Sequence, residues 1–197
     1  MPGPLVIDLD GVLRIWDASI IVDAEAAHGL PPGRLREAVF DDISLLHRAI
    51  TGEITDEEWR EQIAAGLEAS FGPGGRRAVL EWSRPAGRVD HEVLRVLRRE
   101  RGCRTVALFS NATSRLDADL DRLNLAGEFD IVFNSSTLGM AKPAGEAFLA
   151  VAESLNTDPT QCFFVDDSEA NVHAAAGVGF RTHHYVDPTA LERALTL

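Results

Sequence analysis

Apolar residues recur along this chain with two spacings, one typical of buried strands and the other of helices. Short strand-like segments predict strands at residues 5–7, 104–109, 130–133, 161–165 and 181–186. From residue 90 onward, helical spacing of apolar residues fills the intervals between successive strands, and a short helix follows the last one. Because strands alternate with helices, we expect an α/β fold with a Rossmann-like, doubly wound parallel sheet.

The segment between the first two strands has a different pattern, with helical spacing throughout and no strand-like run. Thr55 and Glu58 form a capping-box pattern at the start of one of these helices. Residues 71–75 are expected to form a loop, and residues 84–87 a linker. We therefore expect a helical insertion at residues 17–83, within a core formed by residues 1–16 and 84–197.

Two aspartates, Asp8 and Asp10, directly follow the first strand. In an extended segment, residues two apart project to the same side, so both carboxylates are expected to face one point. Gly11 allows a tight turn after them. Two close carboxylates raise each other's pKa unless a cation lies between them, and Mg²⁺ prefers such oxygen ligands. One carboxylate is then suited to attack an electrophile and the other to move a proton. The alternative is a turn with solvated aspartates.

Polar residues also follow the later strands. Ser110 and Asn111 come after the second, Lys142 after the third, and Asp166 with Asp167 after the fourth. Each set alone is compatible with helix capping or with ordinary surface. Lys142, however, is one of very few lysines in a chain that otherwise uses arginine. Ligands of open α/β sheets bind beyond the carboxyl ends of the strands, so the coincidence favours one site.

Composition narrows the classes of function. Lysine plus arginine is 19 and aspartate plus glutamate is 31, so the net charge is −12. That charge disfavours nucleic acid as a partner but permits a small phosphorylated substrate near local cations. Cys103 and Cys162 are expected to be small buried residues rather than a disulfide or a metal cluster. With neither an apolar leader nor a run long enough for a membrane, we expect a soluble, cytoplasmic protein.

The order of these motifs resembles that of the haloacid dehalogenase-like superfamily of hydrolases over the whole chain. Residues 8–11 match its D-x-D-G motif, and Ser110 with the following Asn matches its second. Lys142 with the following Pro matches the third, and residues 166–167 match the acidic pair of the fourth. The run DDSEANVHAAAGVGF looks like the subgroup that includes the N-terminal phosphatase domain of epoxide hydrolases. The helical insertion is similar to the small helical cap of this superfamily.

This resemblance implies a phosphatase that acts on a small phosphorylated metabolite. Asp8 would be the nucleophile that forms an aspartyl-phosphate. Asp10 would protonate the leaving oxygen and later activate water. Ser110, Asn111 and Lys142 would hold the phosphoryl group. These roles are sensible because phosphoryl transfer is catalysed mainly by positioning and charge neutralisation.

The resemblance also implies a Mg²⁺ ion bound by Asp8, the backbone carbonyl of Asp10, and Asp167, with Asp166 in or near its coordination shell. The dehalogenases of the superfamily lack an acid at the place of Asp10, because a halide needs no proton to leave. The alternatives that remain are a sugar phosphomutase and a catalytically silent binding domain. Trp16 either lines the entrance to the site or packs at the hinge of the insertion.

Overall fold

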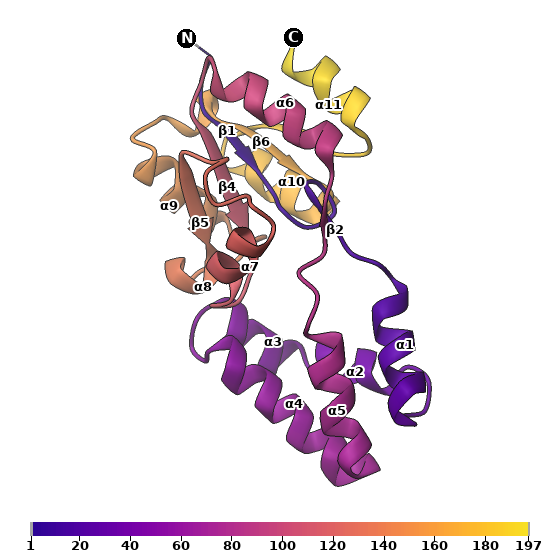
Figure 1. Ribbon diagram of the computed structural model, residues 1–197. Coiled ribbons are helices and arrows are strands. Elements are labelled where there is room, and N and C mark those ends of the chain that lie inside the picture. Colours follow the sequence, from indigo (N-terminus) through magenta and orange to yellow (C-terminus); the bar gives the residue numbers. More distant parts are fainter. Residues whose placement is uncertain (1, 197) are drawn as a thin grey trace.

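A five-stranded parallel sheet forms the centre of the protein in the computed structural model, which describes residues 2–196 (Figure 1). The strand order is β5-β4-β1-β6-β7, with β1 in the middle. The strands are β1 (Leu5–Ile7), β4 (Val106–Ser110), β5 (Ile131–Asn134), β6 (Phe163–Asp166) and β7 (Arg181–His184). This topology confirms the expected doubly wound α/β fold. The order reverses at β1, which is where such sheets bind ligands.

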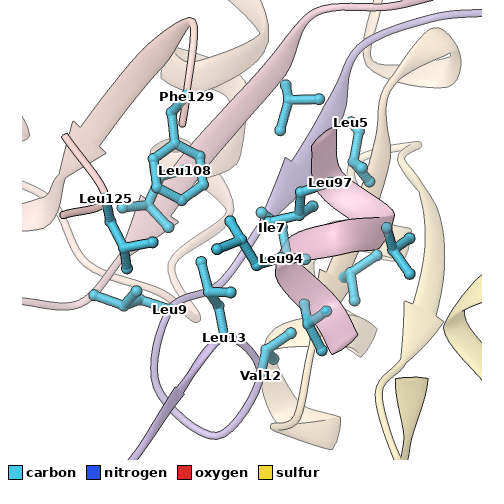
Figure 2. Packing of buried hydrophobic residues seen from close by; sticks show 14 of the residues in the cluster. Leu5, Ile7, Leu9, Val12, Leu13, Leu94, Leu97, Leu108, Leu125 and Phe129 are labelled. Carbon is cyan, nitrogen blue, oxygen red and sulfur yellow. The ribbon is translucent and has the colours of Figure 1, made fainter. Parts of the chain in front are cut away.

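Both faces of the sheet are buried, because successive side chains of each strand point to opposite faces. Leu5 and Ile7 of β1 belong to one apolar cluster and Val6 to the other. Figure 2 shows Leu5 and Ile7 packed with Leu94 and Leu97 of α6. The helices on this face are α6 (His91–Arg101), α7 (Leu116–Arg122) and α11 (Pro188–Leu195), and those on the other face are α9 (Gly145–Ser154) and α10 (Glu169–Gly177).

The regular elements between β2 and β3 are all helices, and they have their own buried cluster, which includes Trp59, Ile63 and Leu67. In Figure 1 these helices lie beyond one end of the sheet and are joined to it by two chain segments. Thr55 forms the predicted capping box with Glu58 at the start of α4. The helices are α1 (Ser19–His28), α2 (Arg34–Phe40), α3 (Ile43–Ile50), α4 (Asp56–Phe71) and α5 (Pro73–Trp82).

The two chain segments pair with each other where they cross. β2 (Arg14–Ile15) and β3 (Arg88–Val89) form a short antiparallel ribbon that the sequence did not predict. Strands of two residues are too short to show any alternation of apolar and polar positions. A second contact ties the helical segment to the core, since the backbone N–H of Asp56 donates to Ser114 Oγ at 3.0 Å.

Two local expectations were wrong. The loop predicted at residues 71–75 is almost entirely helical, because Pro73 begins α5 at the first helical position, where proline is tolerated. Cys103 is exposed rather than buried, because it precedes β4, which begins only at Val106. The short helix α8 (Ser135–Leu138) follows β5, and the turn η1 (Pro159–Gln161) precedes β6. Within residues 2–196, no helix combines the length and apolar character needed to cross a membrane.

Candidate active site

Asp8 lies one residue beyond β1, at the carboxyl edge of the sheet. Its backbone N–H donates to the carbonyl of Val165 at 2.9 Å, which extends the pairing of β1 with β6. Its side chain is buried, and Oδ1 accepts a hydrogen bond from the N–H of Leu9 at 2.7 Å. Lys142 Nζ lies 2.9 Å from the same oxygen. The protein thus holds the Asp8 carboxylate through Oδ1.

Lys142 is buried and is the only lysine of the chain. An ammonium group has three N–H donors. Besides Asp8, Nζ lies 2.6 Å from Asp166 Oδ2 and 2.9 Å from the carbonyl oxygen of Phe109. We refer to Asp8, Lys142, Asp166 and the neighbouring Asp167 as the Lys142 cluster. Its single ammonium group touches the loop after β1 and the ends of β4 and β6.

Asn111 fixes the backbone of Lys142. Its amide nitrogen donates to the carbonyl of Lys142 at 2.7 Å, and the backbone N–H of Lys142 donates to its Oδ1 at 2.8 Å. The Asn111 side chain therefore positions the backbone of Lys142, and its part in holding a phosphoryl group stays a prediction. Ser110 is buried at the end of β4, level with Asn134 of β5.

Asp8, Asp166 and Asp167 each bring a carboxylate oxygen within 4.8 Å of the others. Burial raises the pKa of Asp8 to about 7, with Lys142 opposing the rise and Asp166 adding to it. Burial, followed by the charge of Asp166, also raises the pKa of Asp167. A divalent cation among these oxygens would relieve this repulsion. The donor set is made of hard oxygens and therefore fits Mg²⁺.

The close approach of Asp167 to the loop after β1 depends on Gly11. This glycine has a φ of +76°, and a Cβ on it would lie 2.0 Å from Asp167 Oδ2. Gly11 is thus required both for its backbone conformation and for the space that it leaves. Gly11, which the sequence predicts to allow a tight turn, thus also leaves room for the Asp167 carboxylate beside the loop after β1.

Asp10 does not join the other three carboxylates. Arg14 donates to both of its oxygens, from Nε to Oδ1 and from one terminal nitrogen to Oδ2, each at 2.7 Å. The indole N–H of Trp16 also donates to Oδ1, at 2.6 Å. The buried Arg14 reaches further to Asp119 Oδ2, at 3.2 Å. We refer to Asp10, Arg14, Trp16 and Asp119 as the Arg14 cluster.

Sequence reasoning missed Arg14 and Asp119. They are 105 residues apart, and Asp119 looks like any acidic residue of an amphipathic helix. Of the two alternatives left for Trp16, its contact with Asp10 and its place in the wall of a cavity favour the entrance to the site.

This cavity has a volume of about 490 Å³ and lies between the helical segment and the carboxyl edge of the sheet. Asp10 and Asn111 border it on the side of the core, whereas Trp59 and Trp82 come from the helical segment. The cavity therefore joins the border formed by Asp10 and Asn111 to an apolar space under helices α1–α5.

Comparisons with known proteins identify the family to which this fold and site belong. Residues 5–179 match the family model of the haloacid dehalogenase-like hydrolases. Phosphoglycolate phosphatase from Aquifex aeolicus is 33% identical over 78 residues, which are 39% of this chain and only 37% of that protein. The GMP/IMP nucleotidase YrfG from Escherichia coli is 24% identical over 184 residues, which cover 90% of this chain and 79% of the nucleotidase.

Solved structures of the same fold cover nearly the whole chain. The magnesium complex of the HAD family enzyme bt-2542 from Bacteroides thetaiotaomicron superposes with a TM-score of 0.78 at 24% identity, over 98% of each chain. The family match over most of the sequence carries the assignment, and the parallel sheet with its polar strand ends is consistent with it. This protein belongs to the haloacid dehalogenase-like hydrolase family.

Proposed function

We propose that this protein is a Mg²⁺-dependent phosphatase that hydrolyses a small phosphate monoester through a phosphorylated Asp8. The observation that carries the proposal is the buried ammonium group of Lys142, which holds Asp8 and Asp166 beside Asp167. A fixed carboxylate next to a cation and an acidic metal-binding set suits nucleophilic attack on a phosphoryl group. The phosphatase and nucleotidase names of two relatives support this choice within the family.

Asp8, Asp167 and the backbone carbonyl of Asp10 would hold the Mg²⁺ ion, with Asp166 beside them. When bound, the ion would supply positive charge that neutralises phosphoryl oxygens. Asp166 is already engaged by Lys142, by the backbone N–H of Ser168 at 2.8 Å and by the Asn171 amide at 3.1 Å. We therefore assign Asp166 mainly to the orientation of Lys142.

In the first chemical step, an oxygen of the Asp8 carboxylate attacks phosphorus, and the bond from phosphorus to the ester oxygen breaks. Asp10 in its protonated form gives its proton to the departing alcohol oxygen. Lys142 remains beside Asp8 throughout and compensates the negative charge that gathers on the transferring group.

In the second step, a water molecule attacks the phosphorus of the aspartyl-phosphate while Asp10 accepts its proton. The bond from phosphorus to Asp8 breaks, which releases inorganic phosphate and restores both carboxyl groups. Both oxygens of Asp10 accept from Arg14 in the structure described above. Catalysis therefore requires the Asp10 carboxyl group to exchange one of these contacts for the leaving oxygen or for water.

Asp10 also supports ester hydrolysis over dehalogenation, which is another reaction of the family. An alkoxide is a poor leaving group until it is protonated, whereas a halide leaves without a proton. An acid at the border of the cavity serves only the first of these reactions. We further propose that residues 17–83 act as a cap that encloses the substrate.

The test is a phosphate-release assay with a panel of phosphate monoesters, with and without Mg²⁺. We expect turnover that requires Mg²⁺ and falls by about 10³-fold or more in the Asp8→Asn variant, which keeps the shape of the side chain. Mass spectrometry after acid quenching should find a phosphoryl group on the peptide that contains Asp8. Undiminished turnover by Asp8→Asn would overturn the proposed mechanism.

A further inference from the structure

The cavity beside the site is lined by every tryptophan of the chain, three in all. Trp16 follows β2, Trp59 lies in α4, and Trp82 ends α5. The rings of Trp59 and Trp82 meet edge to face, with centroids 5.8 Å apart. Aliphatic and aromatic side chains extend the same wall, among them Ile20, Ile21, Phe40 and Leu46. Such a wall favours an aromatic or otherwise apolar ligand over a sugar, whose hydroxyl groups would lose water without partners.

The arginines that line the cavity all face aspartates. Arg14 pairs with Asp10 and Asp119, and Arg115 Nε lies 2.9 Å from the other oxygen of Asp119. Arg60 forms an ion pair with Asp56. Within the described residues, this lining therefore offers no unpaired cation to a second anionic group. The negative charge of a second phosphate or of a carboxylate on the ligand would therefore remain uncompensated in this cavity.

From these two observations we propose that the alcohol half of the substrate has an uncharged aromatic body. Its phosphate lies at Asp8, and its ring lies among the tryptophans. This inference rests on the proposed phosphatase function and narrows it to one class of ester.

The test uses esters of primary alcohols, so that the alcohol group that leaves is similar. We expect kcat/KM for 2-phenylethyl phosphate to exceed that for ethyl phosphate by about tenfold or more, because burial of a ring adds binding energy. 2-Phosphoglycolate, which carries a carboxylate, should rank with or below ethyl phosphate.

Two matched variants of α5 test the wall. Trp82→Leu removes an aromatic ring from the lining, so the preference for 2-phenylethyl phosphate over ethyl phosphate should fall. Leu80→Ala removes an exposed side chain of the same helix that is not in the lining, so it should retain that preference. If Trp82→Leu keeps the full preference, the assignment of the ring to the tryptophans is wrong.

A binding experiment separates this inference from the proposed function. Titration of the Asp8→Asn variant with 2-phenylethanol should change the tryptophan fluorescence, because all three tryptophans line the cavity, and glycerol should not. If no ester is hydrolysed but the aromatic alcohol binds, the proposed chemistry fails and the ligand class stands. If kcat/KM for ethyl phosphate or 2-phosphoglycolate equals that for 2-phenylethyl phosphate, or if the alcohol leaves the fluorescence unchanged, the ligand class is overturned.

Discussion

The Lys142 cluster and the Arg14 cluster begin only two residues apart in the chain, yet they are built differently. Asp8 is buried and is held through one oxygen by a lysine that also binds a second carboxylate. Asp10 has a side chain that is 38% exposed, and Arg14 holds both of its oxygens at the border of the cavity. The contrast suits two tasks, because a nucleophile needs a fixed position whereas a group that exchanges protons needs access to substrate and water.

The largest effect is expected from Lys142→Met, which removes the cation of the first cluster. Asp8 and Asp166 would then be buried next to each other without a compensating cation, which costs about 3–5 kcal/mol of unfolding free energy for a broken buried ion pair. Urea denaturation measures this loss, and the phosphate-release assay should show almost no turnover. A variant that is as stable as the original protein would show that the cluster is less dependent on its lysine than its geometry indicates.

A smaller effect is expected from Arg14→Met in the second cluster. Asp119 keeps its contact with Arg115, so the loss of stability should be about 1–2 kcal/mol. Asp10 loses the group that positions it, and kcat should fall by about 10–100-fold with little change in KM. The control is Arg122→Met, since Arg122 is half-exposed and lies 3.5 Å from the same Asp119. An equal fall in kcat for both variants would contradict a positioning role for Arg14.

The smallest effect is a dependence on pH that belongs to the first cluster. The pKa of Asp8 is about 7 in the folded protein against an ordinary value of 3.8. Between these values the folded protein without metal keeps a proton that the unfolded chain has released, so its stability falls as pH rises. Mg²⁺ must displace this proton, and its affinity should therefore rise with pH and level off above about 7.

Calorimetric titration with Mg²⁺ in two buffers of different ionisation enthalpy measures the released proton directly. Asp8→Asn, which cannot bind that proton, should bind Mg²⁺ with an affinity that depends much less on pH. If the original protein binds Mg²⁺ equally well across the acidic range, Asp8 is already ionised and its burial is offset by other groups.

The sequence alone was sufficient to predict the sheet and the first cluster. Apolar runs mark the strands, and the carboxyl ends of parallel strands meet at one edge, so Asp8, Lys142 and the acidic pair at residues 166–167 were expected to lie together. The prediction that Asp10 faces the same point as Asp8 assumed an extended backbone. β1 ends at Ile7, and the turn at Gly11 carries Asp10 toward Arg14 instead.

The second cluster and the cavity could not be predicted in this way. Arg14 lies in the ribbon of β2 and β3 and meets Asp119 of α7, and two-residue strands leave no pattern in a sequence. The wall of the cavity combines side chains from the helical segment with others from the core. The spacing of apolar residues predicts helices, but it does not show which residues of the helical segment meet which residues of the core.

The scarcity of lysine makes the site open to selective chemical labelling. Since Lys142 is the only lysine, the protein contains a single side-chain primary amine, and that amine lies against the proposed nucleophile. Reagents that acylate amines therefore have two targets in this sequence, Lys142 and the amino terminus of the chain. The extent of labelling would therefore report directly how often the interior of the site opens to solvent, without any engineered probe.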